Sequence, residues 1–280
     1  ENGAGKTTSL KILLGLTEPD WGEARVFGLD SRRHGIEIRR RVGYVPEIPV
    51  LYDWMTVEET GWFAAGFYPA NYLKRYRDLI YRFELPLDRR VKDLSKGMRA
   101  KVGLALAMAH EPELLVLDEP TSGLDPLVRR EFLESMSEVA ASGRTVILSS
   151  HQIVEVERVA DVIAIIRDGK LLLVEKLDEL KQNVCELVVT LRNGSTRPPD
   201  LPADVIRRER KERQWRMLVR GINESQIEDV RHREDVSQID IRHPSLDDIF
   251  VAYMHSSEST NGEATGELAT SEPAKGATAP

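Results

Sequence analysis

The sequence predicts an α/β fold with a mostly parallel sheet, an inserted helical subdomain and a small C-terminal α+β appendage. Three observations support this prediction. Candidate strands and helices alternate between about residues 110 and 170. The run Leu114 to Leu117 is apolar throughout, which is typical of a strand buried on both faces. A glycine-rich segment at residues 2–5 comes directly before a helical pattern.

The elements around the central run are assigned from periodicity and turn residues. Leu10, Leu13 and Leu14 recur at helical spacing. The segment between about residues 55 and 94 is helical and aromatic, and we expect its aromatic side chains in the core of the subdomain. Trp21 stands in a Pro-Asp-Trp-Gly turn, where we expect it to pack locally. Predicted strands cover residues 24–27, 42–45, 145–148, 162–166 and 170–174, and predicted helices cover residues 7–16, 96–110, 126–142 and 153–160.

The composition changes after about residue 180. Strands are predicted over residues 186–191, 214–219 and 236–241, with helices over 224–231 and from Ser245 through Met254. From Ser256 onward small and polar residues dominate, so we expect disorder. The predicted division is a domain over residues 1–180 with its helical subdomain at about 55–110, an accessory region over 181–255, and a disordered tail over 256–280.

Composition excludes some classes of function. The formal net charge is -7, so a generally basic, nucleic-acid-coating protein is not expected. No apolar stretch approaches the roughly 18 residues that cross a bilayer, and no secretory leader is evident. A role at a membrane would therefore need a partner that supplies the spans.

Two smaller features are expected to be structural. Cys185 is expected to be a half-buried apolar side chain, and residues 39–41, all arginine, are expected to form a solvated helix end.

The first eight residues, Glu-Asn-Gly-Ala-Gly-Lys-Thr-Thr, match a phosphate-binding loop from its second position onward. Gly3 and Gly5 would let backbone N–H groups converge on phosphate oxygens at the positive end of the following helix. In such loops the lysine, here Lys6, bridges the β- and γ-phosphates, and Thr7 ligates Mg²⁺. A glycine-rich turn that merely opens a helix is the alternative. The expected nucleotide contacts are Asn2, Gly3, Ala4, Gly5, Lys6, Thr7 and Thr8.

A second acidic element follows the apolar run of the central strand. Asp118 and Glu119 come directly after Leu117, which places them at the carboxyl edge of the sheet, where ligands bind in such folds. Asp118 can hold Mg²⁺ through water, and Glu119 can polarise an attacking water. Two acidic residues in a surface loop are the alternative for this segment alone. Combined with the phosphate loop, the pair predicts a P-loop nucleotide triphosphatase core.

Three further segments make the pattern specific to one family. Leu-Ser-Lys-Gly-Met at residues 94–98 precedes Asp-Glu-Pro-Thr-Ser-Gly-Leu-Asp-Pro at 118–126, and Ser-Ser-His follows at 149–151. In this order the segments resemble the ATP-binding cassette (ABC) family of transporter ATPases over about residues 1–180. A glycine before Glu1 would complete the phosphate loop, so we interpret the sequence as beginning inside it. We expect residues 1–280 alone to be poorly soluble and weakly active.

The resemblance implies a head-to-tail dimer that holds two ATP molecules with Mg²⁺ at its interface. Ser95 and Gly97 would contact the γ-phosphate bound by the other subunit, and Asp125 would lie at the dimer seam. His151 would touch the γ-phosphate and orient the attacking water, with Glu119 as the catalytic base. The partner could be a second copy or another ABC subunit. A transmembrane permease would hold the chain at the cytoplasmic face of the membrane and contact part of the aromatic helical surface.

Position 47 departs from the family's commonest form. After Val-Gly-Tyr-Val-Pro at residues 42–46 most members carry Gln, which senses Mg²⁺ and contacts the membrane subunit, whereas this chain has Glu47. A glutamate can still accept a hydrogen bond from Mg²⁺-bound water, but it cannot donate as an amide does. Glu47 together with Leu-Ser-Lys-Gly-Met resembles the branch of drug, polysaccharide and antibiotic-resistance exporters. We therefore expect an ATPase that drives export.

The sequence leaves two alternatives to a transport ATPase. A soluble ABC ATPase of translation or DNA repair usually carries two cassettes or a long coiled-coil insertion, and neither pattern is present. A regulatory module could bind ATP without turnover. Against that reading, the expected catalytic and metal-binding residues are all intact: Lys6, Thr7, Asp118, Glu119 and His151.

Overall fold

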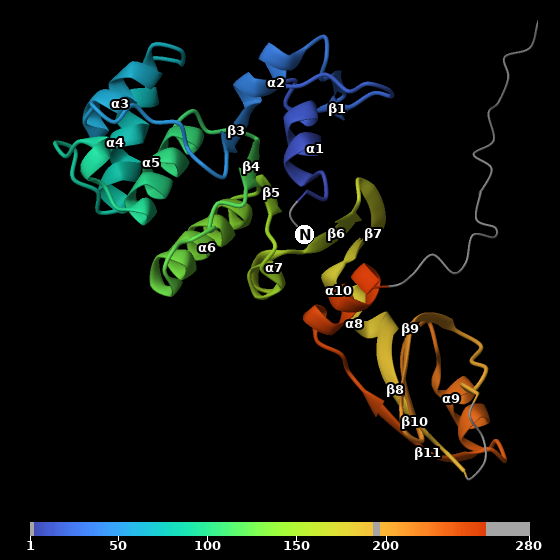
Figure 1. Ribbon diagram of the computed structural model, residues 1–280. Coiled ribbons are helices and arrows are strands. Elements are labelled where there is room, and N and C mark those ends of the chain that lie inside the picture. The colour runs from blue at the N-terminus through green and yellow to red at the C-terminus, as the bar shows by residue number, and fades with distance from the viewer. Residues whose placement is uncertain (1–2, 193–196, 256–280) are drawn as a thin grey trace, which may run out of the picture.

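The computed structural model describes residues 3–192 and 197–255. Asn2 and the tail over residues 256–280, which the sequence predicts to be disordered, lie outside the described residues. Figure 1 shows a helix-covered sheet continuing into a C-terminal part built around a second sheet. The predicted α/β class is confirmed, with a parallel sheet, a helical subdomain and an α+β appendage.

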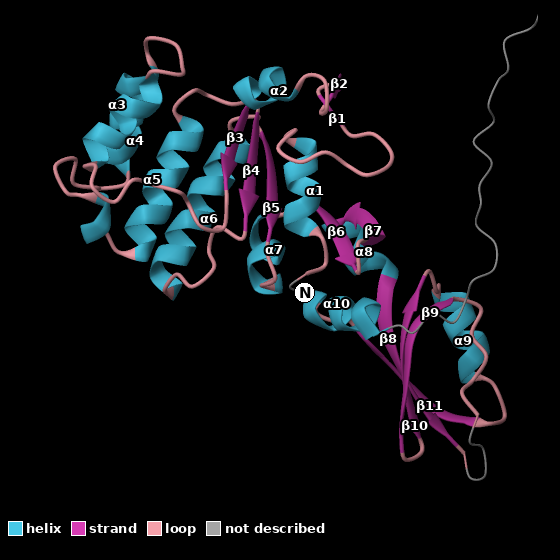
Figure 2. Cartoon of the chain, turned by 45° about the horizontal axis from the view of Figure 1, so that its top comes forward, coloured by secondary structure: helices cyan, strands magenta, loops and turns pink. Residues whose placement is uncertain are grey.

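The central sheet has three parallel strands in the order β3-β4-β5, namely Val42–Val45, Leu114–Asp118 and Thr145–Ser149. Every residue of β4 is buried, as its continuous apolar run predicts. Helices lie on both sides of these strands (Figure 2). Helix α1 (Lys6–Leu13) lies on one side and α6 (Pro126–Ala141) on the other, whereas α2 (Gly35–Arg41) leads directly into β3 and α7 (Ile153–Val159) follows β5. A short hairpin, β1 (Arg25–Val26) with β2 (Leu29–Asp30), precedes α2.

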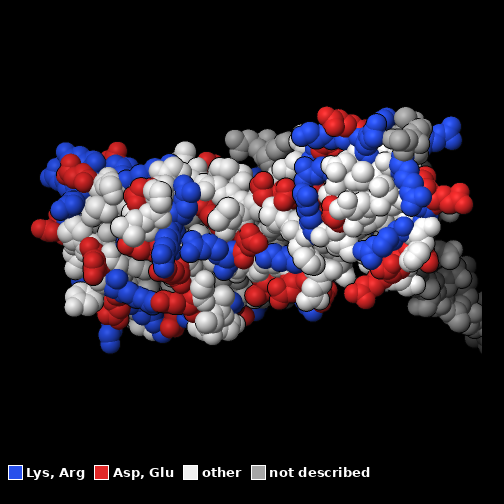
Figure 3. All heavy atoms as spheres, turned by 90° about the horizontal axis from the view of Figure 1, so that it is seen from below, with Lys and Arg blue, Asp and Glu red and all other residues white. Residues whose placement is uncertain are grey.

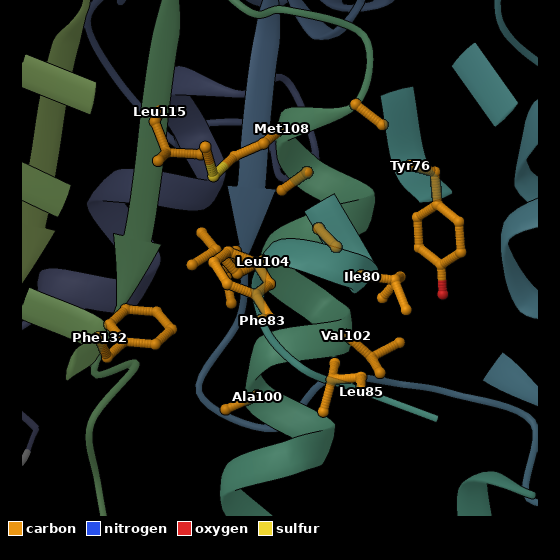
Figure 4. Packing of buried hydrophobic residues seen from close by; sticks show 14 of the residues in the cluster. Tyr76, Ile80, Phe83, Leu85, Ala100, Val102, Leu104, Met108, Leu115 and Phe132 are labelled. Atoms are coloured by element: carbon orange, nitrogen blue, oxygen red, sulfur yellow. The ribbon is translucent and has the colours of Figure 1, made fainter. Parts of the chain in front are cut away.

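The helical subdomain consists of α3 (Val57–Ala65), α4 (Tyr72–Arg82), a 3-10 turn at Val91–Asp93 and α5 (Lys96–Met108). Tyr76 is fully buried, and its hydroxyl donates a 2.8 Å hydrogen bond to the Val57 carbonyl oxygen, which joins α4 to α3. Figure 4 shows how α4 and α5 contribute Ile80, Val102 and Leu104 to a core that continues to β4 and α6. This shared core attaches the subdomain to the sheet.

One expectation about a single residue is wrong, and two expectations about segments hold only in part. Trp21 is 92% exposed rather than packed, because the turn that carries it projects away from any core cluster. The aromatic segment divides into two sets: Tyr72, Tyr76 and Phe83 are buried, whereas Trp62, Phe63 and Phe67 are exposed. The arginine run is not simply solvated. Arg39 donates to the carbonyl oxygens of Leu14 and Gly15, and Arg41 pairs with Glu113.

A β-hairpin follows the central sheet, as predicted. Strands β6 (Val162–Arg167) and β7 (Lys170–Lys176) pair antiparallel. Asp168 and Gly169, which join them, have φ angles of 49° and 74°, the positive values that a tight two-residue hairpin turn requires. Among the described strands β6 pairs with β7 and not with the parallel sheet, a separation that strand–helix alternation alone does not reveal.

The C-terminal part contains a four-stranded antiparallel sheet in the order β11-β8-β10-β9. Its strands are β8 (Val184–Leu191), β9 (Asp204–Lys211), β10 (Gln214–Arg220) and β11 (Val236–Arg242), and its helices are α8 (Leu177–Asn183), α9 (Glu224–Arg231) and α10 (Leu246–His255). Helix α8 and the strongly charged edge strand β9 were not predicted from the sequence. Helix α10 packs with the β6–β7 hairpin in one hydrophobic cluster, which links the two parts.

Candidate functional site

The carboxyl ends of the parallel strands bring several predicted site residues to one edge of the sheet. Asp118 is paired with Ser149 in the β4–β5 register, and Glu119 and His151 follow these strands directly. The β3–β4 register ends at Val45 with Leu117, so Glu47 comes two residues beyond the end of β3, at the same edge. Parallel strands end together, which is why residues far apart in the sequence meet here.

Glu119 is the centre of this edge. The residue is only 7% exposed, and its φ of 48° lies in the left-handed region. Lys6 Nζ lies 3.3 Å from Glu119 Oε1, and His151 Nδ1 lies 2.7 Å from Oε2. Its backbone N–H donates to Ser149 Oγ and to the Ser149 carbonyl oxygen, so the residue is held at both backbone and side chain. A buried carboxylate between a lysine and a histidine is suited to accept a proton from water.

Asp118 occupies a different environment from its neighbour. It is buried, and its Oδ1 accepts a 2.7 Å hydrogen bond from the Ser149 hydroxyl. Burial, and secondarily the charge of Asp118, raises the pKa of Tyr44 on β3 above its ordinary value. The two adjacent carboxylates therefore have different surroundings. Asp118 is hydrogen-bonded to Ser149 of the neighbouring strand, and Glu119 contacts Lys6 and His151.

The phosphate-loop residues lead directly into α1. Gly3 and Gly5 have φ angles of 84° and 95°, so each requires the backbone freedom of glycine. Helix α1 begins at Lys6, and the carbonyl oxygen of Ala4 accepts a 3.1 Å hydrogen bond from Gly169 N at the β6–β7 turn. Thr7 is partly buried and Thr8 exposed at the positive end of the helix dipole.

The segment around Ser95 and Gly97 lies apart from this edge. Figure 1 shows α5 and α1 on opposite sides of the central strands. Ser95 caps α5, since its Oγ accepts from Met98 N, and Gly97 packs so closely on α6 that an added Cβ would lie 2.7 Å from Val128 Cγ1. The structure therefore brings together Lys6, Asp118, Glu119 and His151, and places Ser95 and Gly97 elsewhere.

Asp125 and Glu47 are both exposed. Asp125 caps α6, because its Oδ1 accepts from the backbone N–H groups of Leu127 and Val128 at 3.1 Å. Gly123, two residues before Asp125, lies next to the amino end of α5: a Cβ on Gly123 would come within 2.4 Å of Lys96 Nζ. The residues expected to meet a second subunit or its nucleotide, Ser95, Gly97 and Asp125, thus lie at the starts of α5 and α6, which pack together at Gly97 and Val128.

A magnesium nucleotide fits the residues at the sheet edge. Glu119 Oε1 is buried and lies 3.3 Å from Lys6 Nζ, and Lys6, an ammonium next to a helix amino end, offers a positive charge for phosphate. Among the described residues no group of three or more His, Cys, Asp and Glu side chains could hold a metal alone. Mg²⁺ commonly takes one or two protein ligands together with phosphates and water, so this arrangement suits it.

Several structurally important residues were missed by the sequence analysis. Ser149 anchors both Asp118 and Glu119, and a buried carboxylate on α7, Glu155, bonds to Thr121 and Ser150 next to the site. The hydroxyl residues were visible in the quoted motifs, and their density beside acidic residues was the available signal. Glu155 carried no such signal, because a glutamate in a helical pattern usually faces solvent.

Comparison with known proteins agrees with this geometry. The ABC transporter family model matches residues 1–122. The chain is 35% identical to the ABC transporter ATP-binding protein NatA of Bacillus subtilis, over 65% of this chain and 77% of that protein. It is 36% identical to the bacitracin transport ATP-binding protein BcrA of Bacillus licheniformis, over 65% of this chain and 60% of that protein. A solved structure described as the ATP-binding subunit of an ABC transporter superposes with a TM-score of 0.58 at 37% identity, covering 65% of this chain and 78% of that one.

The chain therefore belongs to the ATP-binding proteins of ABC transporters. It spans 55% to 60% of the length of several curated relatives that it matches. Within residues 3–192 and 197–255, none of the helices combines the length and apolarity that a membrane crossing requires.

Proposed function

We propose that this chain is the ATP-binding and ATP-hydrolysing subunit of an ABC transporter that drives export through a separate transmembrane permease. The observation that carries the proposal is the convergence of Lys6, Glu119 and His151 at the carboxyl edge of the sheet. Relatives named for bacitracin transport and Nod factor export support the export direction. The cargo would be selected by the permease and not by this chain.

Each residue at the edge has a proposed role. Lys6 and the backbone N–H groups of residues 2–8 bind the phosphates, and Glu119 accepts the proton of the attacking water. His151 fixes the orientation of the Glu119 carboxylate through their 2.7 Å contact and reaches the γ-phosphate. When bound, Mg²⁺ would neutralise charge on the phosphate oxygens, and Thr7, Asp118 and Glu47 are the residues proposed to hold it directly or through water.

A second ATP-binding subunit, either another copy or a related chain, is proposed to complete the site. Ser95 and Gly97 would meet the γ-phosphate bound by that subunit, with Asp125 at the seam. Supporting this arrangement, Ser95 is exposed at the amino end of a 13-residue helix, whose backbone N–H groups and positive dipole end suit a phosphate. The separation of α5 from α1 within one chain is the second support.

The exposed aromatic side chains of the helical subdomain are the proposed contact with the permease. Trp54, Trp62 and Phe67 are each more than half exposed, and nearby lies a groove of about 260 Å³ lined by Tyr52, Phe63 and other apolar side chains. Exposed apolar patches of this kind mark interaction sites. In Figure 3, basic and acidic side chains are interspersed over the left part of the face shown. We place the subunit at the cytoplasmic face of the membrane, held by this contact.

We also propose the division into a nucleotide-binding domain over residues 1–180 and an accessory α+β region over 181–255. A separate hydrophobic cluster between the C-terminal sheet and α9 supports it. The boundary is not free of contacts, because α10 packs on the β6–β7 hairpin and Arg220 pairs with Glu175. The accessory region is therefore expected to move with the hairpin.

Replacing the proposed base tests this function. In the natural protein, with any residues that precede Glu1 included, Glu119→Gln keeps the shape of the side chain but removes its basicity. We expect ATP turnover to fall by about 100-fold or more, while ATP binding persists and a nucleotide-dependent dimer accumulates in size-exclusion chromatography. Glu113→Gln is the matched control, because Glu113 is an exposed glutamate paired with Arg41. Undiminished hydrolysis by Glu119→Gln would overturn the assignment of the base.

A further inference from the structure

Glu155 on α7 is a buried carboxylate that the nucleotide chemistry described above does not use. It is only 3% exposed, and hydroxyl groups from two other segments converge on it. Its Oε2 accepts a 2.7 Å hydrogen bond from Thr121 Oγ1 and a 3.0 Å hydrogen bond from Ser150 Oγ. A buried ionised carboxylate is costly unless it is paired, so its position demands a reason beyond packing.

The guanidinium of Arg129 on α6 supplies the opposite charge. Its Nε lies 3.2 Å from Glu155 Oε1. Its Nη1 donates to Gln152 Oε1, and its Nη2 donates a 3.1 Å hydrogen bond to the Leu124 carbonyl oxygen. The pair thus binds the residue directly after His151 and the backbone just before the start of α6. The ion pair and the hydrogen bonds of Arg129 therefore join α6, α7 and the backbone at Leu124.

The hydroxyl partners of Glu155 stand next to the proposed catalytic residues. Thr121 comes two residues after Glu119, and Ser150 comes one residue before His151. The Ser150 hydroxyl also accepts from Gln152 N at 3.0 Å, so it fixes the backbone on both sides of the histidine. Movement of either hydroxyl would therefore change the 2.7 Å contact between His151 Nδ1 and Glu119 Oε2. Misplacement by about 1 Å can cost on the order of 100-fold in rate.

We propose that Glu155 and Arg129 are a positioning pair, which holds His151 against Glu119 and couples that contact to the loop Thr121–Asp125. Because Asp125, the last residue of this loop, lies at the proposed seam, contact with a second subunit there would affect the position of His151. The pair acts through other residues and does not touch the nucleotide. This inference rests on the proposed ATPase function and adds to it a route by which dimerisation reaches the base.

Hydroxyl and carboxylate substitutions test the proposal in the natural protein. Thr121→Val removes the donor with little change in shape, and Thr121→Ser restores it. We expect Thr121→Val and Glu155→Gln to lower kcat for ATP about 10-fold or more, with KM within about twofold, since positioning and not binding is lost. Thr121→Ser should stay close to the wild type. Glu131→Gln is the control, because Glu131 lies on the same helix as Arg129 and makes an exposed pair with Lys101.

Hydrogen–deuterium exchange without nucleotide gives a second readout. Thr121→Val should speed amide exchange in residues 121–128 and 150–153 together, whereas Glu131→Gln should not. An active wild type whose kcat is unchanged by Thr121→Val, or a Thr121→Ser variant as slow as Thr121→Val, would overturn the inference and leave the ATPase assignment intact. A wild type without ATP turnover would instead overturn the proposed function itself. If Glu155→Gln fails to fold, the two Thr121 variants still decide the question.

Discussion

The carboxyl edge of β3–β5 and the amino end of α5 use polar residues in opposite ways. At the sheet edge, Lys6 and His151 converge on the buried carboxylate of Glu119. At α5, Ser95 caps its own helix and remains exposed, and Gly97 permits close packing on Val128. At the sheet edge the polar side chains contact one another, whereas at α5 the amino end of the helix faces solvent. We infer from this difference that one chain carries both halves of the proposed nucleotide site, the sheet edge and the amino end of α5, in separate places.

The exposed aromatic side chains of the helical subdomain provide a test of this comparison, because we expect them to take part in neither half of the proposed nucleotide site. Trp62 is 68% exposed on α3, remote in sequence from both halves. We expect Trp62→Ala to reduce transport in vesicles carrying the complete transporter about 10-fold, because interface tryptophans often dominate binding. ATP hydrolysis by the purified subunit should stay within about twofold.

Tyr81→Ala provides the control for this measurement, because Tyr81 is an exposed aromatic residue on α4, a different helix of the same subdomain. If Trp62→Ala lowered subunit ATPase activity as much as transport, the exposed aromatic side chains would affect the nucleotide site. That result would contradict their assignment to a separate contact with the permease.

A smaller effect is expected in the accessory region. Ser245 and Asp248 form reciprocal hydrogen bonds at the start of α10: Ser245 N and Oγ donate to Asp248 Oδ2, and Asp248 N donates to Ser245 Oγ. Ser245→Ala should cost about 1 kcal/mol of stability, measured by thermal unfolding, and leave ATP turnover unchanged. Ser237→Ala, at an exposed position of β11, should have little effect on stability.

The same cap predicts a pH dependence. Hydrogen bonds from Ser245 hold the pKa of Asp248 below its ordinary value. A carboxyl group whose pKa is lowered by folding stabilises the fold above its ordinary pKa, and this contribution is lost as the pH falls through the folded pKa. The stability difference between the wild type and Ser245→Ala should therefore shrink below about pH 4. A difference that grows on acidification would contradict this account of the cap.

The sequence predicted the regular elements well where pattern and burial agree. The apolar run of β4 and the Asp168-Gly169 turn each specify one local structure, and both predictions are confirmed. Strand β9 was missed because its sequence, Asp-Val-Ile-Arg-Arg-Glu-Arg-Lys, has the charge of a solvated segment, and only pairing with β10 makes it a strand. Exposure of Trp62 and Trp21 was also not predictable, since it depends on which helix face or turn meets the rest of the fold.

The candidate site shows the same limit. The sequence motifs contain Lys6, Asp118, Glu119 and His151. The parallel register explains why the last three meet, and Lys6 joins them through its 3.3 Å contact with Glu119. Their mutual distances, and the support from Ser149 and Glu155, depend on three-dimensional packing that no local pattern encodes. A sequence can thus indicate which residues act, while the residues that hold them in place emerge only from the fold.

Mixing two inactive variants tests most directly whether the two halves act across a dimer. Lys6→Ala disables the phosphate loop, and Ser95→Asp keeps a helix-capping side chain while placing negative charge where the phosphate would bind. Each variant alone should be inactive. After subunit exchange at equal amounts, heterodimers carry one intact site, so hydrolysis should return to about a quarter of the wild-type rate. A mixture no more active than its separate components would contradict a nucleotide site shared between two copies of this chain.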